Sequence, residues 1–494
     1  MVGKGWDRHH GHLARGARFF FPPTQVSPAR SVGRTSADNL PIVFCFQAEI
    51  KGMHILLATQ NSPLQSLIKR SLNRFRYRWT LVDNGFDAFQ TVMTRRFDLI
   101  ILDFDLPRMR APEILKRFSA IENFKTPPCI ILTASEEERL EIEAQGFSKI
   151  EVVARPMVVR HFVQTVQQIL GHEVRIACLG GGTGLFTLLL GLKTLTGVTL
   201  SSIVSMSDDG GSTGVLRDVF GILPPGDVRR SLVALSTAPD LLNELMQYRF
   251  QKGQGLQGHN LGNLLLTALC EIRGNMAMAV ESFGEILNIQ GRVIPVTDTV
   301  NTLKAELDND SIIEGEHRID LFEGHDPRLR IRRLWQDPPA KANPEALEAL
   351  KSARYIILGP GDLFTSIISN LVVDGIREAI LSSPAKKIYI CNVMTKPGET
   401  TDFKVSDHIR EINKYLQKDV LDYVLCSSSQ FSYEALKRYA QKNQVPVIEL
   451  SNKSLEEVTR AQRVWADMVC ERELVRHDSL KLAAEIKKII EKDL

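Results

Sequence analysis

Short apolar segments that look like buried β-strands alternate with helical segments along nearly the whole chain. In its first third, strands are expected near 54–59, 78–83, 98–104, 128–134 and 149–155, and helices near 63–75, 85–96, 110–121, 136–145 and 157–171. Strands that are each followed by a helix form parallel sheets covered by helices on both faces. A second run of this kind begins at Val174. The sequence therefore predicts an α/β protein with two doubly wound parallel-sheet domains, residues 53–171 and 174–494.

The first 52 residues differ in kind from the rest. They mix Gly, Arg, His, Pro and Ser and show neither a helical nor a strand period, so residues 1–52 are predicted to be disordered. A signal peptide would need a continuous apolar stretch, which this segment lacks. Its Arg and Ser would suit a transit peptide. The alternative that we favour is a translation start at Met53, immediately before the first strand.

Composition excludes several classes of partner. The formal net charge is only +3 over 494 residues, and basic residues are interleaved with acidic ones, so no nucleic-acid partner is expected. Because no apolar run approaches the ~20 residues that span a bilayer, no membrane insertion is expected either. The seven cysteines are scattered without CxxC spacing. They indicate reduced thiols of a cytoplasmic protein rather than a disulfide frame or a zinc site.

Polar residues follow three strands of the first domain. Asp103 lies in "LIILDFDLPRM", Thr133 in "IILTAS" and Arg155 in "VVARPM". Ligand and catalytic groups of such sheets collect at the carboxyl ends of the strands. This pattern resembles the flavodoxin-like receiver domain of response regulators over residues 53–171. The resemblance implies that Asp103 is the phosphoacceptor and Thr133 the switch hydroxyl.

Two departures from the receiver pattern affect its chemistry. Thr59 and Gln60 stand where receivers carry an acidic pair that holds magnesium, and Arg155 replaces a lysine. Without the pair, a divalent cation has too few hard oxygen ligands to bridge Asp103 and a phosphate. We expect a degenerate receiver that serves as a dimerisation or docking module, through which a signalling partner would bind.

The second domain opens with a strand that runs into a glycine-rich turn, "VRIACLGGGTGLFTLLL". Glycines let the backbone approach a ligand closely, and the amides at the start of the following helix favour an anion. Gly181, Gly182, Thr183 and Gly184 are therefore predicted to cradle a phosphate. The turn is neither a Walker A loop nor a GxGxxG fingerprint.

A second strand ends in Asp208, Asp209 and Gly210, followed by Arg217. Two carboxylates at a strand end are suited to hold ribose hydroxyls, or a magnesium ion carried by a diphosphate. Asp208 and Asp209 are thus the candidate metal ligands, and magnesium is the one cofactor considered. A solvated turn would tolerate both carboxylates as well.

Further candidates come from helix starts and later strand ends. Asp227 is expected to cap the helix that carries Arg229, whose guanidinium is a candidate phosphate ligand. His259 is either an acid or base or, more simply, a hydrogen-bonded structural group. The remaining predicted nucleotide-binding residues are Asn260, Asn263, Gly359, Pro360, Gly361, Thr365 and Asn392. We expect these turns to converge on one crevice, and residues 404–494 to provide packing or an oligomer surface, so that the protein is a homo-oligomer.

Specific motifs in residues 174–490 resemble the YvcK-type gluconeogenesis factors, which are related in fold to CofD. They include "GGGTGL", "DDGGSTGVLR", "PPGDVRRSLVAL", "GHNLGNLLL", "GPGDLFTSIISNL" and "CNVMTKPGET". The resemblance implies a Rossmann-like domain and a cytoplasmic UDP-sugar-binding factor that supports cell shape and growth on gluconeogenic carbon, with no established reaction.

The CofD branch implies an alternative, a magnesium-dependent transferase of the phospholactate type. Asp208 and Asp209 would then hold the metal, and Arg217 or Arg229 would offset charge at the phosphorus. Departures from the family pattern are Asp362, Phe364 and Ser369.

Overall fold

The computed structural model describes residues 53–494 except 73–76, 123, 148–149, 172–173, 196, 322–325, 327, 450, 472–473 and 494. The segment 1–52, predicted to be disordered, lies outside the described residues. Among the helices of the described part, none is long and apolar enough to cross a membrane.

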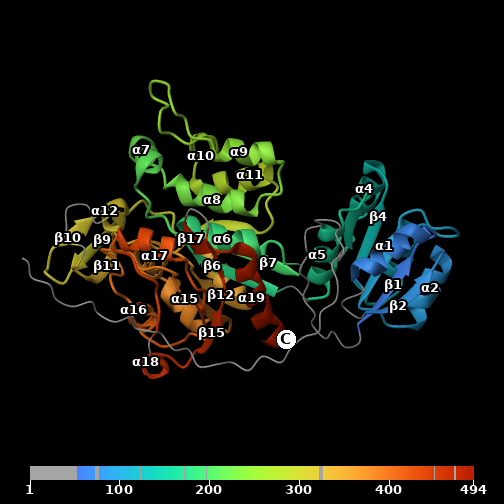
Figure 1. Ribbon diagram of the computed structural model, residues 1–494. Coiled ribbons are helices and arrows are strands. Elements are labelled where there is room, and N and C mark those ends of the chain that lie inside the picture. The colour runs from blue at the N-terminus through green and yellow to red at the C-terminus, as the bar shows by residue number, and fades with distance from the viewer. Residues whose placement is uncertain are drawn as a thin grey trace, which may run out of the picture. The chain divides into compact units, whose positions relative to one another are not determined.

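The first sheet contains five parallel strands in the order β2-β1-β3-β4-β5 (Figure 1, blue to teal). Its strands are β1 (His54–Ala58), β2 (Arg78–Val82), β3 (Leu99–Asp103), β4 (Cys129–Thr133) and β5 (Ile150–Ala154). Its helices are α1 (Ser62–Leu72), α2 (Gly85–Thr94), α3 (Ala111–Ser119), α4 (Glu136–Glu143) and α5 (Val159–Ile169). The order is that of the flavodoxin-like fold, as the sequence predicts.

Alternate residues of the central strands of this sheet pack into two separate cores. Leu56 and Ile100 belong to one core, whereas Ile55 and Ile101 belong to the other. Both faces of a parallel sheet are covered by helices, which is why its central strands read as continuous apolar runs.

The second sheet has seven parallel strands in the order β15-β14-β13-β12-β6-β7-β8. The strands are β6 (Val174–Gly180), β7 (Val198–Val204), β8 (Arg292–Pro295), β12 (Tyr355–Leu358), β13 (Lys386–Ile390), β14 (Tyr423–Ser427) and β15 (Gln462–Ala466). The chain builds outward from β6 in one direction through β7 and β8, and in the other through β12 to β15. The strand order therefore reverses between β6 and β12, and open α/β sheets bind ligands at such a switch point. The predicted fold class of two parallel-sheet domains is confirmed.

Helices cover both faces of the second sheet (Figure 1). They are α6 (Gly182–Leu192), α7 (Gly211–Phe220), α8 (Pro225–Leu235), α9 (Asp240–Gln247), α10 (Leu261–Arg273), α11 (Met276–Ile286), α13 (Pro344–Ser352), α15 (Ile376–Ser382), α16 (Val405–Leu416), α17 (Tyr433–Ala440), α18 (Asn452–Glu456) and α19 (Ser479–Asp493). A π-helical turn, η2 (Leu363–Ile368), runs into the short helix α14 (Ser369–Leu371). The C-terminal helix α19 packs so tightly on α6 that a Cβ at Gly191 would lie 2.0 Å from the carbonyl oxygen of Ser479.

Two small antiparallel sheets complete the larger domain. One has the order β10-β9-β11, with β9 (Thr302–Leu307), β10 (Ile312–Glu314) and β11 (Ile331–Asp337), and the helix α12 (Glu316–Leu321). The other pairs β16 (Val469–Glu471) with β17 (Val475–His477). The sequence pattern predicts neither sheet, and both contribute residues near the candidate site.

Candidate functional site

The turns after β6 and β12 meet at the switch point of the larger sheet. A Cβ on Gly184 would lie 2.2 Å from the carbonyl oxygen of Pro360, a distance that no side chain could tolerate. Gly182 has φ +61°, in the left-handed region that glycine adopts most readily. Gly184 is required because the two turns approach so closely, and Gly182 because of its backbone conformation. Glycine at these positions allows the two turns to pack against each other.

A cavity of about 520 Å³ opens between these turns and the C-terminal part of the domain. Its lining includes Gly181, Gly182, Thr183, Gly184, Thr187, Pro360, Gly361, Asp362, Ser366, Asn392, Thr395, Lys396, Arg438, Tyr439, Lys442, Arg476 and His477. This volume lies in the ~300–1,000 Å³ range of small-molecule sites. The amides in the first turn of α6 border the cavity and have no acceptor within their own helix, so this end suits an anion.

Asp227 fixes the glycine turn from behind. The sequence predicts it as a helix cap, but Pro224 is the N-cap residue of α8 and makes no side-chain cap bond. The Asp227 carboxylate instead accepts the amide N–H of Gly182 at 2.7 Å and pairs with Arg230 at 2.6 Å. The cap interpretation is therefore wrong. The Asp227 carboxylate accepts a hydrogen bond from the glycine turn and so fixes the position of that turn.

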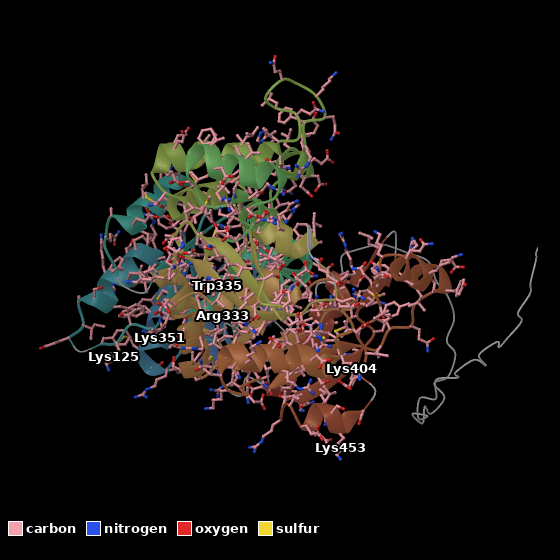
Figure 2. All side chains as sticks on the ribbon, turned by 90° about the vertical axis from the view of Figure 1, so that its left-hand side faces the viewer. Lys125, Arg333, Trp335, Lys351, Lys404 and Lys453 are labelled. Atoms are coloured by element: carbon pink, nitrogen blue, oxygen red, sulfur yellow. The ribbon has the colours of Figure 1, made fainter. Side chains whose placement is uncertain are left out.

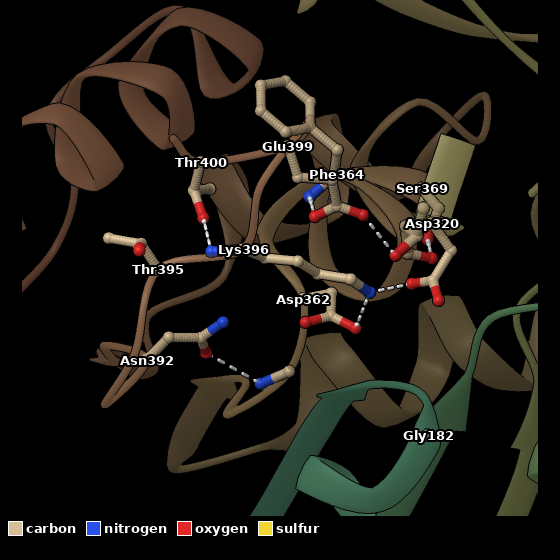
Figure 3. A network of polar contacts seen from close by, with 12 residues as sticks. Gly182, Asp320, Asp362, Phe364, Ser369, Asn392, Thr395, Lys396, Glu399 and Thr400 are labelled. Carbon is tan, nitrogen blue, oxygen red and sulfur yellow. Dashed lines mark hydrogen bonds and ion pairs between the residues drawn. The ribbon is translucent and has the colours of Figure 1, made fainter. Parts of the chain in front are cut away.

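A partly buried ion network forms one wall of the cavity (Figure 3). The Lys396 ammonium pairs with Asp362 at 2.8 Å and also with Asp320. Glu399, which is 2% exposed, accepts a hydrogen bond from the Thr365 hydroxyl at 2.7 Å. The amide side chain of Asn392 accepts the N–H of Gly361 at 3.4 Å. The network ties the turn after β12 to the turn after β13.

Burial changes the protonation of several groups around this wall. It would lower the pKa of Lys396, but the carboxylates of Glu399 and Asp362 outweigh it and hold that pKa above its ordinary value. Burial raises the pKa of Glu399 to about 8 and, with help from Asp320, the pKa of Glu316 to about 10. Burial and the neighbouring Asp227 carboxylate raise the pKa of Asp208 to about 6. Near pH 7 the Lys396 side chain is therefore charged, whereas the Glu399 and Glu316 carboxyl groups are mostly protonated and neutral.

The opposite wall of the cavity comes from the region of α17 and from β17. Arg438 lies on α17, Lys442 lies just beyond its end, and Arg476 lies on β17. The Tyr439 hydroxyl accepts the amide of Val475 at 2.9 Å, which fastens β17 to α17. Cations on this wall and helix amides on the other would favour a ligand with negative charge.

His477 completes this wall. Burial lowers its pKa to about 4, so the ring is neutral near pH 7. Its Nε2 atom is buried and has no hydrogen-bond partner among the described residues.

The predicted site residues fall into two groups. Gly181, Gly182, Thr183, Gly184, Pro360, Gly361 and Asn392 line the cavity. Gly359, Thr365, Asp208, Asp209, Gly210, Arg217, Arg229, Asn260 and Asn263 are not among its lining residues. Of these, Asp208 lies beside the first turn of α8, because a Cβ on Gly226 would lie 2.6 Å from its carboxylate.

The Asp208-Asp209 pair is divided between different partners. Asp208 accepts the amide of Gly210 at 3.0 Å, whereas Asp209 accepts the amide of His317 at 2.7 Å and lies 3.9 Å from Arg217. Across the described residues, no group of three or more His, Cys, Asp or Glu side chains is arranged to hold a metal ion. Magnesium bound with a diphosphate needs only one or two protein carboxylates, but neither Asp208 nor Asp209 lines the cavity.

Arg229, Asn260 and Asn263 form a buried structural cluster beneath the helices. The Arg229 guanidinium donates to the side-chain oxygen of Asn263 at 2.9 Å and to the carbonyl of Met246 at 3.3 Å. The Asn260 side chain caps α10 by accepting the amide of Asn263 at 3.1 Å. His259 bonds the Ser212 hydroxyl at 3.1 Å, in keeping with its interpretation as a structural group.

None of the cations Lys396, Arg438, Lys442 and Arg476, which line the cavity, was predicted from the sequence. Lys396 follows a strand end in "NVMTKPGE", a signal comparable to the one used for Asn392. Arg438 and Lys442 carry only the weak signal of two basic residues four positions apart. Arg476 and His477 lie in a short strand that no local pattern indicates.

The first domain has its own strand-end site, and it is closed. Asp103 is 6% exposed and accepts the Thr59 hydroxyl at 2.8 Å. The Arg155 guanidinium reaches both oxygens of Asp103, at 3.1 and 3.4 Å. The Thr133 hydroxyl is fully buried and has no partner in the part of the chain that is described. The candidate phosphoacceptor is thus buried and paired with a cation of its own domain, although its Oδ1 atom has no hydrogen-bond partner among the described residues.

Comparisons with known proteins match the two domains of this chain to two different families. The family model of 2-phospho-L-lactate transferase CofD matches residues 176–464, and that of the response regulator receiver domain matches residues 55–167. The gluconeogenesis factor of Bacillus subtilis is 39% identical over 320 residues, which are 64% of this chain and 98% of that protein. The gluconeogenesis factor of Listeria monocytogenes is 38% identical over 311 residues, 63% of this chain and 93% of that protein.

A solved structure agrees with these sequence matches. Protein BH3568 from Bacillus halodurans is 38% identical, with a TM-score of 0.60 over 64% of this chain and 99% of that chain. The two glycine turns and Lys396 lie within the residues that the CofD family model matches. The chain belongs to the CofD-like family, among the gluconeogenesis factors, and carries a response regulator receiver domain ahead of the family domain.

Proposed function

We propose that the larger domain binds a nucleotide-sugar, with a UDP-sugar as the favoured ligand, and acts as a regulatory factor rather than as an enzyme. The observation that carries this proposal is the two-sided cavity at the switch point. Helix amides beside Gly182 and Gly184 face a wall with Arg438, Lys442 and Arg476. A diphosphate bears the negative charge that both walls favour.

The cavity also offers groups for the uncharged parts of such a ligand. The neutral His477 ring, the Asn392 amide and Tyr439 are suited to hydroxyls, to a base edge and to a ring face. In this proposal the protein is cytoplasmic and supports cell shape and growth on gluconeogenic carbon, as the resemblance to gluconeogenesis factors suggests. The receiver domain would contact a signalling partner, and the protein would be a homo-oligomer.

A transferase of the phospholactate type is the second candidate, favoured by the CofD family match. In that case magnesium carried by the diphosphate donor would supply charge stabilisation at the transferred phosphorus; Asp208, the predicted metal ligand, lies outside the cavity lining. This chain's own contribution would be to orient the donor on the glycine turn and to keep Lys396 charged beside it. Regulator and enzyme share the cavity and differ in whether the ligand is altered.

Calorimetry separates the two candidates. Binding of UDP-N-acetylglucosamine to the full chain would be measured with and without magnesium, and the recovered nucleotide would be checked for cleavage. We expect micromolar binding, an intact ligand and at least a tenfold loss of affinity in Arg476→Ala, because one charge-assisted hydrogen bond contributes about 1.5–3 kcal/mol.

Lys453→Ala is the matched control, since Lys453 is exposed and does not line the cavity (Figure 2). Equal affinity in wild type and Arg476→Ala would reject the cavity as the binding site. Magnesium-dependent cleavage of the nucleotide would instead establish the transferase.

A further inference from the structure

Two packed helices of the larger domain expose apolar side chains along their outer surface. Helices α9 and α10 are antiparallel neighbours, because the amide of Leu261 at the start of α10 donates to the carbonyl of Tyr248 at the end of α9, at 2.8 Å. Leu241 therefore lies toward the same end of the pair as Ile272, and Leu245 toward the same end as Leu265. The exposed fractions are 68% for Leu241, 42% for Leu245, 39% for Leu265 and 74% for Ile272.

Helix α7 extends this surface. Its first turn is tied to the start of α10, because the Ser212 hydroxyl accepts the amide of Asn260 at 3.3 Å. Val215 and Val219 are one turn apart on α7 and are 50% and 71% exposed, and Phe220 is 46% exposed. An apolar stripe at helical spacing normally faces a packing partner rather than solvent.

A loop of residues 250–259 projects from the same layer. Its base is closed by hydrogen bonds between Phe250 and His259 and between Gly258 and Phe250, both 2.9 Å. Residues 251–258 are all exposed, and Leu256 in this loop is 42% exposed. Figures 1 and 2 show the loop extending away from the helices in two perpendicular views. We refer to residues 250–259 as the arm.

The apolar area of this face is comparable with what a stable dimer needs. Nine large apolar side chains are between 39% and 74% exposed on α7, α9, α10 and the connection that includes the arm. Such side chains together present on the order of 700 Å². A standard interface buries roughly 800 Å² per partner, and most monomers have no patch above about 300–600 Å².

The charges around the face indicate which partner fits. On α7, α9, α10 and the connection between α9 and α10, four basic residues stand against four acidic ones, namely Arg217, Arg249, Lys252 and Arg273 against Asp218, Asp240, Glu244 and Glu271. A nucleic acid or an anionic membrane would require an excess of basic residues. A rim with equal numbers of acidic and basic residues can instead pair with the identical rim of a second copy related by a two-fold axis.

We propose that the face formed by α7, α9, α10 and the arm is the surface through which two copies of this chain associate. The exposed apolar stripes of one copy pack against those of the other, and each arm reaches across the two-fold axis. This differs from the expectation that residues 404–494 provide the oligomer surface. It does not depend on which ligand the cavity binds.

Sedimentation velocity of the full chain, from low to high micromolar concentration, tests the proposal. We expect a monomer–dimer equilibrium in the wild type. The double variant Leu241→Glu/Ile272→Glu should weaken association at least about 100-fold, because central apolar contacts typically contribute 2 kcal/mol or more each. Both side chains are mainly exposed, so the variant should keep the wild-type circular dichroism spectrum and melting temperature.

Two matched controls place a glutamate at apolar residues of similar exposure elsewhere. Leu140→Glu lies on α4 of the receiver domain at 55% exposure, and Leu480→Glu lies on α19 at 51%. Both should dimerise like the wild type. A monomeric wild type, an unchanged double variant, or loss of the dimer in Leu140→Glu or Leu480→Glu would each overturn the proposal.

Discussion

The two parallel sheets of this chain each carry polar residues at their switch point, yet only one of these places is open. In the receiver domain the Asp103 carboxylate is 6% exposed and is held by Thr59 and Arg155. In the larger domain the corresponding place is a cavity of about 520 Å³, bordered by Gly182 and Gly184. Strand order brings functional groups together in both sheets.

What differs is how the polar groups are satisfied. Asp103 has its charge neutralised by an arginine of its own domain. At the glycine turn Asp227 takes up the amide of Gly182, while the next amides of the α6 first turn keep no acceptor within their helix. A carboxylate that is already paired with a cation of its own domain gains little from a ligand. A site whose amide donors have no acceptor within the protein gains hydrogen bonds when a ligand binds. Four predictions test this contrast, in order of decreasing effect.

The largest effect is expected from Lys396→Met. Lys396 is the cation among Asp320, Asp362 and Glu399, and its loss leaves the partly buried Asp320 and Asp362 without a counter-charge. Because these two carboxylates are partly exposed, the cost should be about 3 kcal/mol, the lower end of the range for a buried pair, seen as a lower melting temperature of the larger domain in calorimetry. The double variant Lys396→Met/Asp362→Asn removes one of those charges and should regain part of the loss. A single variant as stable as the wild type would contradict the network's role.

The second prediction concerns pH. Asp208 binds its proton more tightly in the folded chain than in the unfolded chain, because burial raises its folded pKa to about 6 from an ordinary value of 3.8. Its contribution to stability is therefore complete at the acidic end and is lost as pH rises from near 4 through 6. Asp208→Asn should remove this loss, worth on the order of 3 kcal/mol.

The measurement is urea unfolding of the larger domain at several pH values between these limits. Asp218→Asn is the control, because its side chain is 67% exposed on α7. If Asp208→Asn and the wild type keep a constant difference in stability across the range, Asp208 is not the group responsible.

The third prediction addresses the contact between the two glycine turns. Gly184→Ala places a Cβ against the carbonyl of Pro360, so the turns must separate. We expect a loss of about 2 kcal/mol in stability and a clear loss of nucleotide affinity in calorimetry. Gly180→Ala is a control in the same segment, where the added Cβ would meet the Leu185 side chain at an ordinary 3.5 Å. Equal behaviour of the two variants would show that the close approach does not shape the cavity.

The smallest effect is expected in the receiver domain. Wild-type Asp103 should not be labelled by acetyl phosphate with magnesium, and magnesium should not change the domain's melting temperature. Thr59→Asp supplies a missing carboxylate and should introduce stabilisation by magnesium of about 1 kcal/mol. A labelled wild type would show that the pairing with Arg155 opens readily, and the contrast between the two sites would fail.

Much of this protein could be predicted from local sequence alone. Apolar runs predicted the five strands of the receiver sheet within a residue or two, because a central strand covered on both faces must be continuously apolar. Glycines at close approaches, such as Gly184, left a local signal, as did the missing acidic pair at Thr59 and Gln60. The motifs of the glycine turns and the later strand ends were specific enough to indicate the family.

The tertiary fold decides which of these residues lie in the same site. Asp208 and Arg229 carry the same kind of pattern as Gly182, yet Asp208 lies against Gly226 outside the cavity lining and Arg229 is buried against Asn263. Arg476 showed no pattern, yet it lines the cavity because β17 folds back onto α17. The reason is physical: local sequence sets the helix or strand, whereas the neighbours of a strand end depend on strand order and on segments hundreds of residues apart.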